Sequence, residues 1–267
     1  MRTKHHRLLV PTLALFVAFI VLLAPGITRP LHAQVTPAYV ALGDSIEFGL
    51  GDNILGDGFG YVDPFGVFLS TVLGQPVAVH NFGEPFARVQ DIRKRQLPDA
   101  LAALNGHQPL IASWGGGGND LGEVATGPQA AACRRSESCL GRFNGLLNEV
   151  EQTIDHTIGD LRAAMGPNGR ILMRTQYNAL LRAGCAPPEV VTLGNVTLEG
   201  APGTVLDRGL NDRIRSVAQR YGANVVDLFG PFAFNANVLV AADCIHPSGA
   251  GYQAILALSQ AAYLAGP

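Results

Sequence analysis

The chain has 267 residues, of which 48% are hydrophobic and 15% charged, and its formal net charge is −2. This length is enough for one large domain with a buried core, and the composition excludes a disordered chain or a protein that coats nucleic acid. The slightly acidic balance also disfavours binding to nucleic acid or anionic lipid surfaces.

The first 33 residues have the layout of a secretory signal peptide. Three basic residues among the first seven precede an almost wholly apolar run over residues 8–24, and Leu31-His32-Ala33 offers a small-residue cleavage site. The alternative is an uncleaved membrane anchor. Cleavage is favoured because the run is near the lower end of the roughly 17–25 residues that a span needs and Pro11 interrupts it.

Cleavage would leave residues 34–267 as a single exported domain. Four of the 19 basic residues and none of the 21 acidic residues lie in residues 1–33, so the mature net charge becomes −6. We expect no nucleic-acid partner and, once the signal peptide is removed, no stable membrane partner.

Apolar runs and helical spacings alternate along this domain. Five runs have the composition of β-strands: residues 37–44, 77–82, 110–114, 170–176 and 224–228. Segments with the apolar spacing of helices fall between and after them: residues 61–73, 89–104, 143–165, 204–221 and 250–264. Residues 122–141 and 179–203 are expected to be long loops. The order predicts an α/β domain with a parallel sheet of about five strands, covered on both faces, whose carboxyl ends meet at one edge.

Gly43-Asp44-Ser45 follows the first strand, which should leave the serine hydroxyl at this edge of the sheet. A serine there is also a common helix cap, so this motif alone is weak evidence for catalysis. Glu47 lies close to it. One interpretation is that this carboxylate influences substrate choice, but a solvated surface carboxylate is favoured.

Asp243 and His246 stand three residues apart near the end of the chain. This spacing lets the carboxylate accept a hydrogen bond from one imidazole nitrogen while the other faces a serine, as a general base requires. The alternative is a loop carboxylate beside a surface histidine.

Asn119 follows a glycine run, residues 115–118, after the third strand. Its amide can donate to a developing oxyanion, and the glycines allow the backbone to approach a ligand closely. A phosphate-binding loop is disfavoured because neither the P-loop spacing nor the dinucleotide fingerprint is present. The G-x-S-x-G elbow of the α/β-hydrolases is also absent.

The four cysteines predict two disulfides in an exported chain. Sequence alone leaves three pairings open; if Cys133 pairs with Cys139 across a small loop, Cys185 would meet Cys244. A zinc site is disfavoured, because there is no C-x-x-C spacing and no histidine beside the first three cysteines.

Together these blocks resemble the SGNH hydrolase (GDSL esterase/lipase) family. The matching blocks occur in the family's order and are Gly43-Asp44-Ser45, Asn81-Phe82-Gly83, Gly117-Gly118-Asn119-Asp120 and Asp243-Cys244-Ile245-His246-Pro247. The resemblance implies a flavodoxin-like three-layer α/β/α sandwich and a serine hydrolase acting on small-molecule or lipid esters, without a metal or organic cofactor.

The resemblance also implies roles for individual residues. Ser45 would be the nucleophile, His246 the base and then the acid, and Asp243 the residue that orients His246. Asn119 and the backbone amide of Ser45 would bind the oxyanion.

The second block departs from the family's Asn-x-Gly-x-Ser-Gly. The last glycine, which supplies an oxyanion amide, corresponds here to Phe86, whose side chain could narrow the acyl pocket. Either the Phe86 amide or, in a shifted turn, the Gly83 amide would take this role.

The sequence therefore predicts a secreted esterase or lipase. The alternatives are a carbohydrate or cell-envelope O-acetyl esterase, and an acyltransferase or acyl-binding module of the same fold.

Overall fold

A five-stranded parallel sheet forms the centre of the fold. The computed structural model describes residues 35–51, 60–125, 133 and 136–266; the predicted signal peptide lies outside them. The strands are β1 (Ala38–Leu42), β2 (Ala78–Asn81), β3 (Leu110–Gly115), β4 (Arg170–Arg174) and β5 (Asn224–Val226). They run in the order β2-β1-β3-β4-β5, and every neighbouring pair is parallel. The predicted α/β class and strand number are confirmed.

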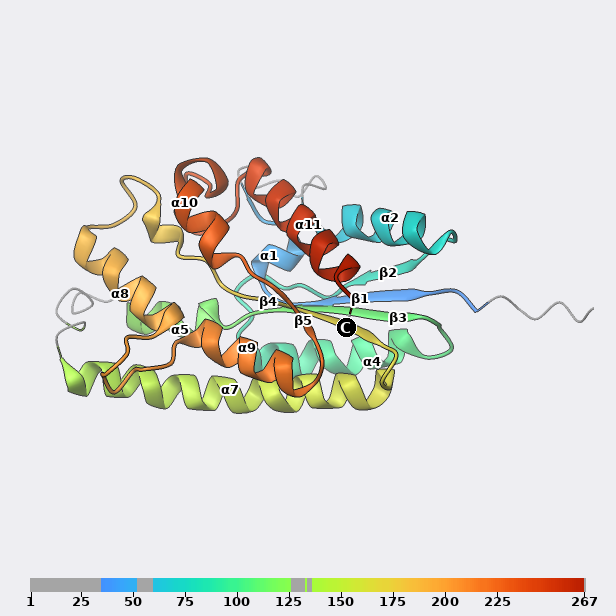
Figure 1. Cartoon of the computed structure of the whole chain (residues 1–267), viewed down its shortest axis with the longest axis horizontal. Helices are drawn as coiled ribbons and strands as arrows, with labels where there is room; N and C mark the ends of the chain where they lie inside the picture. Colours follow the sequence, from blue (N-terminus) through green and yellow to red (C-terminus); the bar gives the residue numbers. More distant parts are fainter. Residues whose placement is uncertain (1–34, 52–59, 126–132, 134–135, 267) are drawn as a thin grey trace, which may run out of the picture. The chain divides into compact units, whose positions relative to one another are not determined.

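Helices cover both faces of the sheet (Figure 1). One layer contains α2 (Val62–Leu73), α10 (Phe229–Leu239) and α11 (Gly249–Leu264), with the short α1 (Ser45–Phe48) beside them. The opposite layer contains α4 (Leu97–Leu104), α7 (Glu137–Met165) and α9 (Leu210–Arg220). This is the three-layer α/β/α arrangement that the resemblance implies.

The side chains of β1 point alternately to the two faces of the sheet, which explains why the sheet has an apolar core on each side. Tyr39 and Ala41 pack in one apolar cluster with residues of α2, α10 and α11. Val40 and Leu42 pack in the other, with residues of α4, α7 and α9. Successive strand residues point to opposite faces, so a strand covered by helices on both sides must be apolar throughout. All five residues of β1 are buried.

Several helices differ from the prediction. The predicted helix over residues 89–104 consists of α3 (Val89–Asp91), a π-helix η1 (Ile92–Gln96) and α4. The predicted loop 179–203 contains a 3₁₀ turn, η2 (Ala179–Leu181), and α8 (Pro188–Glu199). That loop prediction is wrong because the glycines, prolines and β-branched residues there weaken the helical signal, whereas α8 begins with a proline at its first position, where proline is tolerated.

The other predicted loop, residues 122–141, is also partly helical. It holds the end of α5 (Gly118–Ala125) and the first residues of α7, which begins at Glu137. The helix α10 was not predicted, since Gly230 and Pro231 near its start are poor helix formers. The helix is also irregular, because the backbone at Asn235 is not helical. Within the described residues, every helix is too short or too polar to span a bilayer.

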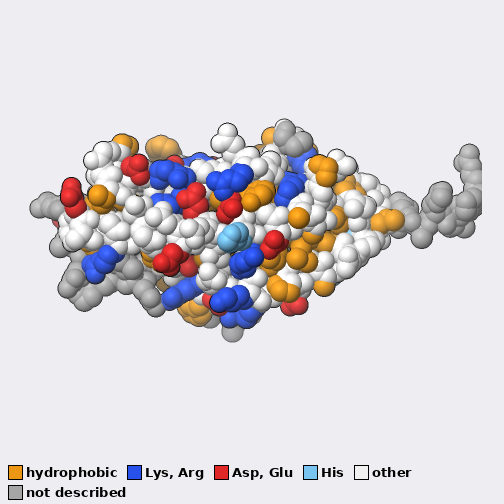
Figure 2. All heavy atoms as spheres, turned by 90° about the horizontal axis from the view of Figure 1, so that it is seen from below, with side chains coloured by type: hydrophobic (Ala, Val, Ile, Leu, Met, Phe, Trp, Pro, Cys, Tyr) orange, Lys and Arg blue, Asp and Glu red, His pale blue; other side chains and the backbone are white. Residues whose placement is uncertain are grey.

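Figure 2 shows the outer face of the α7 layer, on which basic and acidic side chains lie side by side. Ion pairs connect this layer: Arg93–Asp160, Arg208–Glu151, Arg213–Glu151 and Arg220–Asp155. Charges of both signs neutralise one another locally, so this face does not present the one-sign field that attracts a polyanion.

Candidate active site

Ser45 lies at the start of α1, just beyond the carboxyl end of β1. Asp44 caps this short helix: its Oδ1 accepts the N–H of Ile46 at 3.0 Å, and its own N–H donates to Glu47 Oε2 at 3.1 Å. The capping role considered for Ser45 is therefore filled by Asp44. Among the described residues the Ser45 hydroxyl has no hydrogen-bond partner, so it is available to a ligand.

His246 lies in a loop between α10 and α11, residues 240–247, which we call the His246 loop. An antiparallel bridge between Val240 and Pro247 closes the loop at its base. Asp243 Oδ1 accepts the backbone N–H groups of Ile245 and His246, each at 3.0 Å, and Oδ2 lies 2.5 Å from His246 Nδ1. The carboxylate thus fixes the imidazole through Nδ1 and leaves Nε2 directed elsewhere.

The pKa of Asp243 is lowered. Partial burial alone would raise it, but the hydrogen bonds from the backbone and ring of His246 and from the backbone of Ile245 outweigh burial. Asp243 therefore stays ionised at neutral pH, as orienting His246 requires.

Ser45, Asn119 and His246 line one cavity of about 250 Å³. β1 delivers Ser45 to it and β3 delivers Asn119, and these strands are neighbours at the centre of the sheet, where the strand order reverses. Sheets of this kind bind ligands at this position. Asp243 is not in the cavity wall and lies behind His246.

The Asn119 side chain is anchored by Nδ2, which donates to the carbonyl oxygen of Ala87 at 2.9 Å. A side-chain amide has two N–H donors, and within the described parts of the chain the second has no partner, so it remains for a ligand.

Gly83 and Phe86 do not line this cavity. The Gly83 N–H donates to Asn81 Oδ1 at 2.9 Å, and a Cβ at Gly83 would meet the backbone of Phe48 and Glu47. Its amide is therefore already engaged. Phe86 has φ 65°, a conformation that favours glycine, and its side chain is 82% exposed instead of narrowing the pocket.

Glu47 is not a solvated surface residue, contrary to our interpretation of the sequence. It is fully buried and forms an ion pair with Arg174, which is 2% exposed: Nε and Nη2 donate to its two oxygens at 2.9 and 3.0 Å. Tyr61 donates to the same carboxylate at 3.1 Å, and Asp44 lies 3.5 Å from Arg174 Nη2. A buried charge network thus lies directly beneath the nucleophile.

Burial raises the pKa of Glu47 to about 7, although the Arg174 guanidinium acts in the opposite direction. The pKa of Arg174 is raised: burial lowers it, and Glu47 and Asp44 outweigh burial. Arg174 is therefore charged in the folded protein at every pH of interest.

Two glycines make room for this pair. A Cβ at Gly43 would collide with the Glu47 carboxylate, and one at Gly115 would collide with Glu47 and Arg174. Gly115, the last residue of β3 and the first glycine of the run, therefore serves the close packing of a buried ion pair, whereas the sequence predicts that the run allows a ligand to approach.

Gln96, which sequence reasoning also missed, holds the backbone before the nucleophile. Its amide accepts from the N–H of Gly43 and donates to the carbonyl oxygen of Gly43, both at 2.8 Å. Gln96 ends the π-helix, a distortion that frequently occurs at functional sites.

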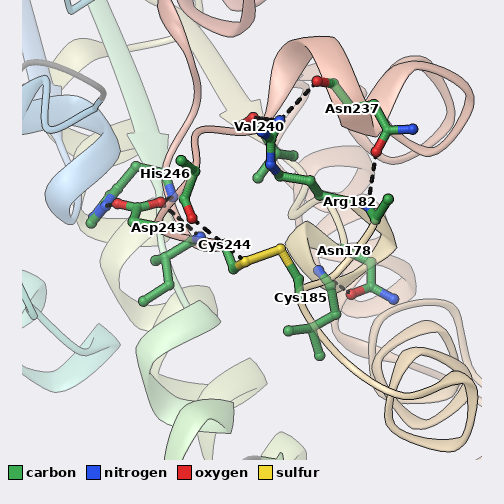
Figure 3. Close-up of a disulfide and its surroundings, with 12 residues drawn as sticks. Asn178, Arg182, Cys185, Asn237, Val240, Asp243, Cys244 and His246 are labelled. Carbon is green, nitrogen blue, oxygen red and sulfur yellow. Dashed lines mark hydrogen bonds and ion pairs between the residues drawn. A yellow bond between two sulfur atoms is a disulfide. The ribbon is translucent and has the colours of Figure 1, made fainter.

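The structure pairs Cys133 with Cys139 and Cys185 with Cys244. The second disulfide attaches the His246 loop to the segment after β4 (Figure 3).

Residues 177–185, which we call the clamp segment, hold this loop by further contacts. Tyr177 donates to the carbonyl oxygen of Ile245 at 2.7 Å. Arg182 Nη1 donates to the carbonyl oxygens of Asn237 and Val240 at 2.8 and 2.9 Å, as Figure 3 shows. The clamp segment therefore fixes the loop that carries the proposed base.

The comparisons with known proteins show the family and the fold. The GDSL-like Lipase/Acylhydrolase family model matches residues 41–254. None of the curated proteins matches the chain significantly.

Solved structures share the fold at low sequence identity. The lipase Lip_vut3 from a goat rumen metagenome is 19% identical, with a TM-score of 0.66, and the alignment covers 85% of this chain and 97% of that one. A variant of Axe2, an acetyl-xylooligosaccharide esterase from Geobacillus stearothermophilus, is 18% identical, with a TM-score of 0.57 and coverage of 86% and 94%. The lipase/acylhydrolase from Enterococcus faecalis is 18% identical, with a TM-score of 0.54 and coverage of 85% and 94%.

Proposed function

Because the chain belongs to the GDSL-like lipase/acylhydrolase family and is a carboxylic ester hydrolase, we propose that it is an exported serine hydrolase that acts through an acyl-enzyme on Ser45. The observation that carries the proposal is the common cavity of Ser45, Asn119 and His246, with Asp243 bonded to the far side of the imidazole.

In the first half of the reaction the Ser45 Oγ bonds to the carbonyl carbon of the ester, and its proton passes to Nε2 of His246. The bond between the carbonyl carbon and the alcohol oxygen then breaks, and His246 gives its proton to the departing alcohol. In the second half a water molecule attacks the acyl group while His246 takes its proton. The bond to Ser45 breaks, the carboxylic acid leaves and the proton returns to the serine.

Three donors would stabilise the oxyanion of each tetrahedral intermediate. They are the second N–H of Asn119, the backbone N–H of Ser45 and the backbone N–H of Phe86. The Ser45 amide belongs to the first turn of α1, where backbone donors have no partner within the helix. Neither Gly83 nor Phe86 lines the cavity, and of the two we favour Phe86 because the Gly83 amide is engaged with Asn81.

Export is supported by the predicted signal peptide and by the two disulfides, which fit an oxidising environment outside the cytoplasm. Expression of the full chain with its own N-terminus, followed by N-terminal sequencing of the protein in the medium, tests it. We expect a first residue near Gln34; retention in the membrane fraction would contradict cleavage.

The catalytic proposal is tested with p-nitrophenyl butyrate. We expect Ser45→Ala and His246→Ala to lower kcat by at least about 10⁴-fold, and Asn119→Ala to lower it by about 10²–10³-fold. The matched control is Ser216→Ala, which should keep full activity. Ser216 lies on α9, and its hydroxyl accepts a hydrogen bond from Arg208. Ser45→Ala with undiminished turnover would contradict the proposal.

A further inference from the structure

We propose that the cavity beside Ser45 binds an unbranched aliphatic acyl chain, and that Gly122 of α5, because it lacks a side chain, leaves the cavity long enough to hold that chain. This inference rests on the proposed ester hydrolysis and adds the substrate class. The cavity volume is about 250 Å³. At about 30 Å³ for each water-sized group, it accommodates about eight non-hydrogen atoms, many more than an acetyl group has.

The walls that the proposed catalytic residues do not supply are largely aliphatic. They come from α1, α5, the 3₁₀ turn η2, α8 and the His246 loop: Ile46, Leu121, Ala179, Leu180, Leu198 and Ile245. Such walls stabilise an apolar chain by removing its surface from water.

Asn178 is a polar wall residue whose groups are already engaged. Its Nδ2 donates to the carbonyl oxygen of Val191 at 3.0 Å and to Asn195 Oδ1 at 2.8 Å, and its Oδ1 accepts the N–H of Leu180 at 3.1 Å. Both amide hydrogens are therefore used in fastening α8 to η2 and are not free to bind a substrate hydroxyl.

Gln176 and Thr197 are engaged in the same way. Gln176 Nε2 donates to the carbonyl oxygen of Gly116 at 2.9 Å, while its Oε1 accepts from Arg174 at 3.3 Å. Thr197 donates to the carbonyl oxygen of Gly194 at 3.0 Å. A site that selects a sugar presents polar groups without protein partners, because these bind the hydroxyls. These walls instead direct their polar groups into the protein.

Gly122 is the position where the cavity can be shortened. It lines the cavity, and a Cβ added there meets no atom of the described residues within 4 Å. Gly194, also in the wall, differs because its Cβ would lie 2.8 Å from Asn178 Nδ2. A side chain at residue 122 therefore meets no atom of the part of the chain that the structure describes, whereas one at residue 194 would disrupt the hydrogen bonds of Asn178.

The test measures kcat/KM of the full exported chain on p-nitrophenyl acetate, butyrate, hexanoate, octanoate and decanoate. Each buried methylene raises kcat/KM by up to about fourfold, so we expect a rise from acetate to an optimum of about four to eight carbons and a fall at decanoate. Gly122→Leu should lower the hexanoate-to-acetate ratio of kcat/KM at least tenfold. If Gly122→Leu fails to fold, Gly122→Ala should lower it about threefold.

Gly145→Leu is the matched control, since Gly145 is an exposed helical glycine of α7 whose added Cβ also meets open space. Its ratio should stay within about twofold of the wild type. A wild-type preference for acetate or for acetylated xylo-oligosaccharides would overturn the inference, as would an equal loss on all esters in Gly122→Leu. Each of these results leaves the proposed function intact, whereas turnover by Ser45→Ala contradicts the proposed function itself.

Discussion

The two sides of the candidate site are held by different means. On the Ser45 side, Glu47 and Arg174 form an ion pair that is almost completely buried, and the sheet and α1 pack around it. On the His246 side, the side chain of Asp243 is 41% exposed, and the loop is fixed from outside by the clamp segment and a disulfide. The position of the proposed nucleophile thus depends on the core of the fold, whereas that of the proposed base depends on a cross-link.

The pKa values of the carboxylates on the two sides also shift in opposite directions. Burial raises the pKa of Glu47. For Asp243, burial is outweighed by hydrogen bonds from His246 and Ile245, and the pKa falls. The Ser45 side and the His246 side should therefore respond differently to substitutions and to changes of pH or redox conditions.

Removing one member of the buried pair should strongly lower the stability of the protein. Glu47→Ala leaves the Arg174 guanidinium buried without the carboxyl group that accepts its hydrogen bonds, and we expect the free energy of unfolding to fall by about 3–5 kcal/mol in urea denaturation. The double variant Glu47→Leu/Arg174→Met should recover much of this loss, since no unpaired charge remains.

The matched control is Glu84→Ala, which breaks the exposed pair of Glu84 with Arg95. We expect a change below about 1 kcal/mol. Equal losses in Glu47→Ala and Glu84→Ala would show that the buried pair does not support the Ser45 side.

Removing the disulfide between Cys185 and Cys244 should affect activity as well as stability. From sequence separations of 59 and 6 residues, chain entropy predicts a loss of about 4 kcal/mol for Cys185→Ser/Cys244→Ser and about 2 kcal/mol for Cys133→Ser/Cys139→Ser. Only the first variant should lower kcat per folded molecule, by at least about tenfold, because the proposed base loses its alignment.

Reduction of the wild type offers an independent measurement. Activity should fall further than the helical signal in circular dichroism. The idea fails if both decline in parallel, or if the two disulfide variants lose kcat equally.

The two carboxylates predict opposite dependences of stability on pH. Because the folded-state pKa of Glu47, about 7, exceeds the unfolded value of about 4.3, its stabilising contribution is complete below about pH 4 and is lost as the pH rises through 7. Asp243, whose pKa is lowered, contributes stability above about pH 4 that is lost as the pH falls through its folded-state pKa.

Unfolding free energies measured from pH 3 to pH 8 test both of these pH dependences. Glu47→Gln should lack the decline between pH 5 and pH 8, and Asp243→Asn should keep that decline but lack the additional fall below pH 4. A wild type that becomes steadily more stable from pH 5 to pH 8 would contradict the shift of Glu47.

Phe86→Gly should have the smallest effect. Phe86 adopts φ 65° and is largely exposed, so glycine relieves backbone strain and should stabilise the protein by up to about 1 kcal/mol. The proposed oxyanion N–H is retained, and kcat should stay within about threefold. Phe234→Gly, at a similarly exposed position in the helix α10, should instead destabilise the protein by about 1 kcal/mol. Destabilisation by Phe86→Gly would show that its side chain has a structural role.

Local patterns made much of this molecule predictable. The strands were found because each is a short apolar run with a turn after it, and Asp243 and His246 were found because their contact spans only three residues. Arg174 and Glu47 are 127 residues apart, and Gln96 and Gly43 are 53 apart, so no short spacing indicates either contact. The α8 wall was missed because Gly194 and several β-branched residues obscure its periodicity.

The central claim, that Ser45 is the nucleophile activated by His246, is tested most directly with a fluorophosphonate probe that reacts with activated serines. Mass spectrometry of the digested protein should find one adduct, on the peptide that contains Ser45. Labelling should be absent in Ser45→Ala and at least about 100-fold slower in His246→Ala. An adduct on another residue, or an unlabelled enzyme that still hydrolyses esters, would contradict the account.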